Sequence, residues 1–199
     1  PEAALDYRPA VPGAAGADPT GHRSPARCGT GPWQDRAVTD LPVHRFEARD
    51  GVVLAYRELG QGRPVVLLHG LFSTATVNWV RFGHAEALAA AGHRVILPDL
   101  RAHGDSAAPH DPAAYPADVL ALDGADLVAH LGLGEHDLVG YSLGGRTVLR
   151  MLVRGARPRR AVVAGMGLDA VVSTASGNER YRRVLTVLGT FERGSPEWM

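Results

Sequence analysis

The chain has 199 residues, a length that suits one domain with a substantial hydrophobic core or part of a larger one. Its formal net charge is zero, so the composition predicts no nucleic-acid partner. The single cysteine, Cys28, excludes an internal disulfide and a cysteine-based metal site. No apolar run reaches the roughly 18 residues of a membrane span, and no secretory signal is visible, so we expect a cytoplasmic protein.

The first segment, residues 1–40, differs from everything after it. Prolines recur there among Ala, Gly, Arg and Asp, with no apolar periodicity. Such a composition cannot bury enough apolar surface to offset the entropy of ordering, so we predict that residues 1–40 are disordered. The chain begins with Pro1 rather than methionine, and we therefore expect an incomplete or wrongly assigned start.

The folded part is predicted to begin near Leu41 with a hairpin. Residues 43–48 and 52–57 alternate in polarity on either side of Asp50-Gly51, a dipeptide typical of a tight turn between two strands. The next strand, residues 65–68, is continuously apolar. Continuous apolarity is typical of a strand that is covered on both faces, as in a mostly parallel sheet.

From there the chain alternates between helices and strands. The predicted helices are 78–91, 115–131 and 143–154, and the predicted strands are 94–98, 137–141 and 161–165, the last of them buried. This alternation predicts an α/β fold, with a mostly parallel central sheet flanked by helices on both faces.

A serine lies where the strand 137–141 meets the following helix. Gly140, Ser142 and Gly144 form the pattern G-x-S-x-G. A serine at such a corner has a strained backbone that exposes its hydroxyl group, and the flanking glycines allow the neighbouring backbone to approach closely. The helix that follows directs its free N–H groups and its positive dipole end at the same point.

This pattern also occurs by chance in glycine-rich chains, and the sequence contains 24 glycines. The alternative interpretation is therefore a Gly-Ser turn without chemical significance. The strand before the turn and the helix after it favour the functional interpretation.

Two further loops carry matching motifs. His69-Gly70-Leu71 follows the strand 65–68, and residues 99–106, with the sequence D-L-R-A-H-G-D-S, follow the strand 94–98. With the serine turn, these loops resemble the H-G-x, D-x-R-G-H-G-x-S and G-x-S-x-G motifs of the α/β-hydrolase superfamily, with Ala102 in place of the usual glycine. The resemblance implies an α/β-hydrolase fold that lacks the last strands. It divides the chain into a core, residues 41–167, and the start of a truncated helical cap, residues 168–199.

The resemblance also implies roles for individual residues. Ser142 would be the nucleophile, and the backbone N–H groups of Leu71 and Leu143 would form the oxyanion hole. Supporting positions are His69, Gly70, Gly140, Tyr141 and Gly144. His69 is interpreted as a structural residue of its turn rather than as the catalytic base. Haloalkane dehalogenases and epoxide hydrolases of this fold have an aspartate in place of the serine, so Ser142 disfavours those activities. The resemblance leaves open the hydrolysis of an ester, lipid, lactone or carbon–carbon bond, and cofactor-free perhydrolase chemistry.

The remaining triad residues are harder to assign. Asp169, after the sixth predicted strand, is the candidate acid, although most members of the superfamily carry the acid one strand later. The family's histidine follows the serine in the chain, but the last of the nine histidines here is His136. Three explanations stay open: an N-terminal portion of an ordinary serine hydrolase, a homologue that has lost catalysis and acts as a binding or interaction module, and completion of the site by another chain.

The expected function is therefore a serine hydrolase that acts on an ester or a related acyl bond and is catalytically incomplete as given. Leu71, Phe72, Trp79 and Tyr141 suggest a small apolar substrate. We expect no cofactor and no metal site. Without its last strands the sheet would have an open apolar edge beside the sixth strand, which predicts self-association.

Overall fold

The computed structural model describes residues 41–167, which form one six-stranded sheet with helices around it. The predictions of a disordered segment 1–40 and of a cap beginning at residue 168 lie outside the described residues. The strands are β1 His44–Glu47, β2 Val53–Leu59, β3 Arg63–Leu68, β4 His93–Pro98, β5 Asp137–Tyr141 and β6 Arg160–Ala164. The α-helices are α1 His84–Ala90, α2 Val119–His130 and α3 Leu143–Val153, and there are two short helical segments, η1 Thr76–Val80 and η2 Pro112–Ala114.

The predicted hairpin is present at the start of the fold. Strands β1 and β2 pair antiparallel, with Phe46 opposite Leu54. Gly51 adopts a positive φ of 82° in the turn between them, a conformation that glycine reaches without steric cost. The hairpin joins the rest of the sheet because β2 pairs antiparallel with β4.

The other strands are parallel, which sets the position of the three motif loops. The strand order is β1-β2-β4-β3-β5-β6, with β3 between β4 and β5. The carboxyl ends of β3, β4 and β5 therefore lie at one edge of the sheet. The residues that follow these strands, His69, Asp99 and Ser142, meet at this edge, as is usual for sites in α/β sheets.

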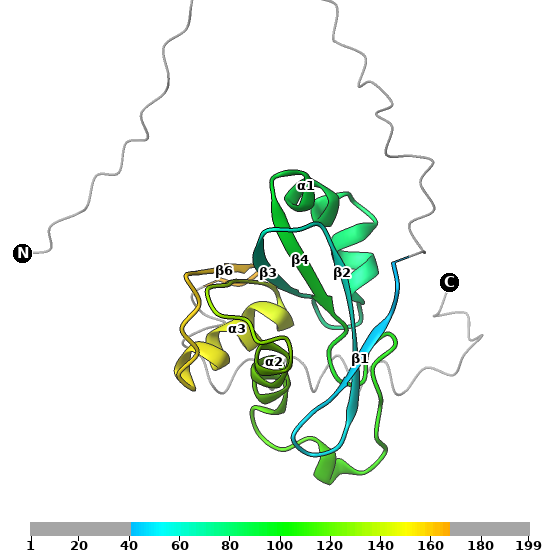
Figure 1. Cartoon of the computed structure of the whole chain (residues 1–199). Helices are drawn as coiled ribbons and strands as arrows, with labels where there is room; N and C mark the ends of the chain where they lie inside the picture. The colour runs from blue at the N-terminus through cyan, green and yellow to red at the C-terminus, as the bar shows by residue number, and fades with distance from the viewer. Residues whose placement is uncertain (1–40, 168–199) are drawn as a thin grey trace, which may run out of the picture. The chain divides into compact units, whose positions relative to one another are not determined.

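Helices cover both faces of the sheet, as the alternation predicts. Figure 1 shows α2 and α3 side by side on one side and α1 on the other. Along β3 the side chains alternate: Val66 and Leu68 pack with α2 and α3, whereas Val65 and Leu67 pack with η1 and α1. These four side chains are at most 3% exposed, so the continuous apolarity of β3 reflects burial on both faces.

Two predicted helices are shorter than expected. The predicted helix 78–91 is divided into η1 and α1, because Gly83 adopts a left-handed conformation with φ 76° between them. The predicted helix 115–131 begins only at Val119. Pro116 disfavours a helical conformation at Tyr115, and Asp118 is left-handed with φ 65°, so both residues delay the helix start.

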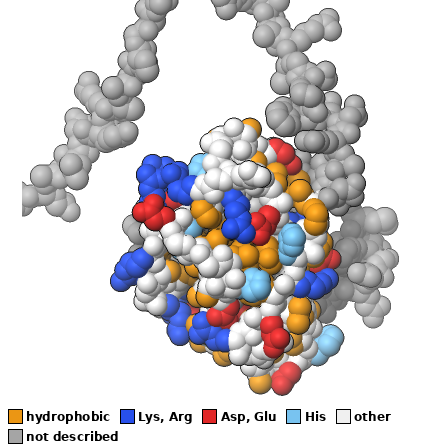
Figure 2. Space-filling model, in the orientation of Figure 1, with side chains coloured by type: hydrophobic (Ala, Val, Ile, Leu, Met, Phe, Trp, Pro, Cys, Tyr) orange, Lys and Arg blue, Asp and Glu red, His pale blue; other side chains and the backbone are white. Residues whose placement is uncertain are grey.

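The prediction of a buried sixth strand is wrong for the described residues. Within residues 41–167, β6 pairs only with β5 and lies at the end of the sheet, and Val162 is 50% exposed. A short apolar run predicts a strand but does not reveal its place in the sheet. Figure 2 shows that Arg side chains lie beside Asp and Glu side chains, and neither sign of charge dominates the visible face.

Candidate active site

Ser142 occupies a sharp corner between β5 and α3. Its backbone has φ 51° and ψ −110°, one of four positive-φ conformations of a non-glycine residue in the described part of the chain. Such a conformation costs of the order of 1–3 kcal/mol and persists only where the surrounding structure enforces it. The corner is fixed by hydrogen bonds from Ser142 N–H to Ala164 O and from Arg146 N–H to Ser142 O.

The two flanking glycines make this corner sterically possible. A Cβ at Gly140 would lie 2.2 Å from the carbonyl oxygen of Gly144, and a Cβ at Gly144 would lie 2.1 Å from that of Leu68. Both separations are far shorter than any real contact, and both neighbours are backbone atoms. The G-x-S-x-G pattern therefore holds α3 directly against the ends of β5 and β3.

The turn after β3 lies beside this corner. A Cβ built at Gly70 would be 3.2 Å from the ring of Tyr141 and 3.6 Å from the Cβ of Ser142. The Gly70 N–H donates to the side-chain oxygen of Asn78 in η1, at 2.9 Å. Asn78 thus fixes the peptide between His69 and Gly70, one residue before Leu71.

The N–H groups of Leu71 and Leu143 are among the amides that form no hydrogen bond within residues 41–167. Leu143 is the first residue of α3, where backbone N–H groups lack an intrahelical partner and the helix dipole is positive. Within the described residues both amides are therefore free to donate to a ligand, and they remain the candidate donors of an oxyanion hole.

His69 is wholly buried, and both of its ring nitrogens are engaged. Its Nε2 accepts a hydrogen bond from the Leu100 N–H at 2.9 Å, which leaves Nδ1 to donate to Gly70 O at 2.8 Å. Burial lowers the pKa of His69, so the ring is neutral in the folded protein. The geometry agrees with a structural role and leaves no free nitrogen to accept a proton from Ser142.

This lowered pKa predicts a pH-dependent stability. Because unfolded His69 takes up a proton near pH 6.5, the free energy of unfolding should fall below that pH, by at most about 1.4 kcal/mol per pH unit for one group. Urea unfolding at pH 7.5, 6.5 and 5.5 measures this fall. In His69→Gln, which cannot titrate, the fall should be smaller than in the parent chain; equal pH profiles would contradict the assignment.

The loop after β4 is built around Asp99. Its carboxylate accepts hydrogen bonds from the N–H groups of Ala75 (2.8 Å) and Asp105 (3.1 Å) and pairs with Arg57 (3.0 Å). A Cβ at Gly104 would lie 2.4 Å from this carboxylate. Ala102, which stands where the motif usually has glycine, has a φ of 65°, so the chain keeps a left-handed conformation there at some steric cost.

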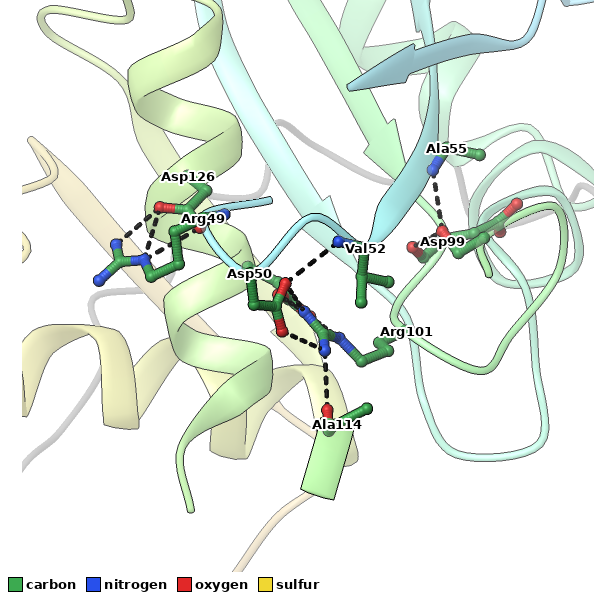
Figure 3. A network of polar contacts seen from close by, with 10 residues as sticks. Arg49, Asp50, Val52, Ala55, Asp99, Arg101, Ala114 and Asp126 are labelled. Carbon is green, nitrogen blue, oxygen red and sulfur yellow. Dashed lines mark hydrogen bonds and ion pairs between the residues drawn. The ribbon is translucent and has the colours of Figure 1, made fainter. Parts of the chain in front are cut away.

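Arg101 connects the same loop to α2, to the hairpin turn and to the short helix η2. Its guanidinium, 1% exposed, donates to both carboxylate oxygens of Asp123 in α2 (3.0 and 2.7 Å) and of Asp50 in the hairpin turn (2.6 and 2.9 Å). It also donates to Ala114 O at 2.7 Å. Figure 3 shows the guanidinium between the hairpin turn and the short helix that ends at Ala114. Hydrogen bonds from Arg101 lower the pKa of Asp50.

A model of the alpha/beta hydrolase fold family matches residues 63–191, well over half of the chain. This chain belongs to the alpha/beta hydrolase fold family. The match includes all three motif loops, among them the strand-to-helix corner at Ser142, here called the elbow. The observed sheet agrees with the expected fold class.

Curated relatives of this α/β-hydrolase carry several activities in their names. A non-heme haloperoxidase from Rhodococcus erythropolis is 36% identical over 137 residues, 66% of this chain and 47% of the relative. Bifunctional epoxide hydrolase 2 from Sus scrofa is 34% identical over 116 residues, 58% of this chain and 20% of the relative. An sn-1-specific diacylglycerol lipase, ABHD11, from Mus musculus is 41% identical over 91 residues, 45% of this chain and 28% of the relative. The chain thus spans less than half the length of these relatives.

Solved structures agree on the fold. The crystal structure of an epoxide hydrolase from Vigna radiata superimposes with a TM-score of 0.55 at 28% identity, over 61% of this chain and 37% of that protein. An epoxide hydrolase from an endophytic Streptomyces gives a TM-score of 0.54 at 27% identity, over 62% and 36% of the two chains.

The structure brings Ser142, Leu143, Gly70 and Leu71 together, whereas the candidate acid Asp169 lies outside the described residues. Phe72 and Tyr141 are exposed, at 65% and 45%, but Trp79 packs against the core cluster of Val65 and Leu67. Within residues 41–167, no group of three His, Cys, Asp or Glu side chains could hold a metal ion. In the same part of the α/β-hydrolase, no helix has the length and apolarity needed to cross a membrane.

Three polar residues that support the site were not predicted from the sequence: Asn78, Arg57 and Asp50. Their partners, Gly70, Asp99 and Arg101, are 8, 42 and 51 residues away in the chain. No local pattern links such pairs. For Asp50 alone the sequence gives a partial indication, because Asp50-Gly51 is predicted to form a tight turn next to the sheet.

Proposed function

We propose that this α/β-hydrolase is a serine hydrolase in which Ser142 attacks the acyl carbon of an ester. The observation that carries the proposal is the strained conformation of Ser142, φ 51° and ψ −110°, at the junction of β5 and α3. Glycine would relieve that strain, so a serine retained there is best explained by a need for its hydroxyl group.

In the proposed reaction the Ser142 Oγ forms a bond to the carbonyl carbon and gives its proton to a base. The carbonyl oxygen becomes an oxyanion, which the N–H groups of Leu71 and Leu143 would stabilise. Collapse of this intermediate breaks the bond to the alcohol, which leaves with the proton, and water then hydrolyses the acyl-enzyme.

The base is unassigned, and Asp169 remains the candidate for the acid that orients it. All nine histidines precede Ser142 in the chain, and His69 is engaged at both nitrogens. The resemblance implies a histidine that follows the serine, so we propose a base that residues 41–167 do not supply, from further sequence or from another chain.

The choice of an ester rests on the nucleophile. Relatives named as epoxide hydrolases and a relative named as a diacylglycerol lipase are both similar to this chain. The resemblance implies an aspartate at this position in epoxide hydrolases, whereas this chain has Ser142. The exposed side chains of Phe72 and Tyr141 support an apolar acyl group.

Hydrolysis of p-nitrophenyl butyrate by the protein translated from its whole reading frame tests the proposal. Ser142→Ala should lower kcat by at least about a thousandfold, the scale seen when an activated serine is removed. Ser73→Ala, which removes another half-buried serine from the loop after β3, is the matched control and should keep the activity. A folded parent protein that hydrolyses styrene oxide but not the ester would reject the proposal. A folded parent protein that hydrolyses neither substrate would also reject it and would favour a non-catalytic binding protein.

A further inference from the structure

A groove of about 180 Å³ lies between the start of α2 and one side of α3. Asp118 and Leu120 line it from the α2 side, and Leu143, Arg146, Thr147 and Arg150 line it from α3. The volume is far above the roughly 10–15 Å³ that one water molecule needs, so the groove can hold a chemical group of a ligand.

One end of the groove lies next to Ser142. The helix α3 begins directly after Ser142, at the carboxyl edge of the sheet, and the groove follows its side from Leu143 to Arg150. Leu143 directly follows Ser142 in the chain and lines the groove. Arg146, one helical turn further, donates its backbone N–H to Ser142 O at 2.9 Å. A ligand in the groove would thus lie close to the candidate nucleophile.

The one acidic side chain that lines the groove is already paired. Asp118 accepts hydrogen bonds from Arg150 at 2.6 and 2.5 Å and from Arg154 at 3.1 Å. These hydrogen bonds, chiefly that of Arg150, lower the pKa of Asp118, so it is ionised at neutral pH. Asp118 is the N-cap residue of α2, yet its side chain makes no capping hydrogen bond and accepts hydrogen bonds from Arg150 and Arg154 instead.

Arg146 is different, because its guanidinium has no ion pair and no side-chain hydrogen bond to any residue from 41 to 167. It is half-buried in the wall of the groove. The lining therefore holds two cations and one anion; Arg150 and Asp118 pair with each other, which leaves the charge of Arg146 uncompensated within the described residues. A guanidinium presents a planar set of donors that matches the oxygen atoms of a carboxylate or a phosphate.

We propose that this groove is a subsite for an anionic group, a carboxylate or a phosphate, carried by the acyl substrate. Arg146 binds the anion, and Asp118 holds Arg150 in position beside it. The proposal rests on the proposed serine hydrolase function and extends it: the preferred ester carries a negative charge in addition to its apolar portion.

Binding of free anions tests the groove without any turnover. Glutarate and inorganic phosphate are titrated into the whole Ser142→Ala protein by calorimetry, and the tighter of the two identifies the preferred anion. Adding Arg146→Gln should weaken binding by about tenfold or more, as expected for loss of a charge-assisted hydrogen bond. Arg157→Gln removes an exposed arginine outside the groove lining and should leave the affinity unchanged. Equal affinities with and without Arg146 would overturn the proposal.

The link to the substrate is tested with two esters. In the otherwise unchanged protein, Arg146→Gln should lower kcat/KM for mono-p-nitrophenyl glutarate by about tenfold, mainly through KM, and leave p-nitrophenyl butyrate unaffected. Equal losses for both esters, or no loss for either, would overturn the subsite. If the parent protein hydrolyses neither ester, the proposed function fails, while the titration still decides whether Arg146 binds anions.

Discussion

Gly144→Ala should lower the free energy of unfolding by about 3 kcal/mol or more, because the new Cβ has no space. It would lie 2.1 Å from the carbonyl oxygen of Leu68 and 2.8 Å from that of His69. Both atoms belong to the backbone at the end of β3, which is paired on both sides and cannot move without breaking the sheet. Alanine is the better helix former, but that advantage of about 1 kcal/mol is smaller than the steric cost.

Chemical denaturation followed by circular dichroism measures the effect. Gly134→Ala is the matched control, because the same change there meets no atom within 4 Å and needs no positive φ. It should leave the free energy of unfolding almost unchanged. If Gly144→Ala is as stable as Gly134→Ala, the close contact between α3 and β3 is incorrect, and with it the geometry of the elbow.

Arg101→Met should destabilise the fold by about 3–5 kcal/mol, the range found when one partner of a buried ion pair is removed. The side chain of Asp123 is 7% exposed and would lose the guanidinium that donates to both of its oxygens. Asp50 would lose the same partner, and the hairpin turn would no longer be tied to the loop after β4. Because Leu100 in that loop hydrogen-bonds His69, the turn beside Ser142 should also become less ordered.

Arg49→Met is the control for this prediction. Arg49 also binds an aspartate of α2, Asp126, but its side chain is 55% exposed, so its loss should cost much less than the loss of Arg101. Burial already raises the pKa of Asp123, and removal of Arg101 should raise it further. The deficit of Arg101→Met should therefore shrink as the pH falls below neutrality, because protonation of Asp123 removes its unpaired buried charge. A deficit equal to that of Arg49→Met at pH 7 would contradict the assignment.

The fold and the central part of the site follow local patterns, and for that reason they were predictable. Alternation of apolar residues identified the hairpin, continuous apolarity identified β3, and the three motif loops follow successive strands. The glycines of the elbow are informative because backbone atoms approach within a distance that no side chain tolerates at Gly140 and Gly144. Such a steric requirement can be predicted from the sequence because it involves a short motif, the glycines that flank Ser142.

The errors have two sources: local signals within an apolar helical pattern, such as Gly83 and Pro116, and features without a local signal. The break at Gly83 and the late start of α2 depend on left-handed residues within otherwise helical patterns. The exposure of Val162 depends on the place of β6 in the sheet rather than on its own residues. The supports of the site, from Asn78 to Gly70 and from Asp50 to Arg101, are formed by chain folding and become visible only in three dimensions.

The most direct test of the serine hydrolase proposal is covalent labelling of the whole protein with a fluorophosphonate, followed by mass spectrometry of the labelled peptide. We predict one adduct, on Ser142, and its loss in Ser142→Ala while Ser73→Ala is still labelled. A folded protein that carries no adduct, or an adduct on another residue that persists in Ser142→Ala, would contradict the assignment of Ser142 as the nucleophile.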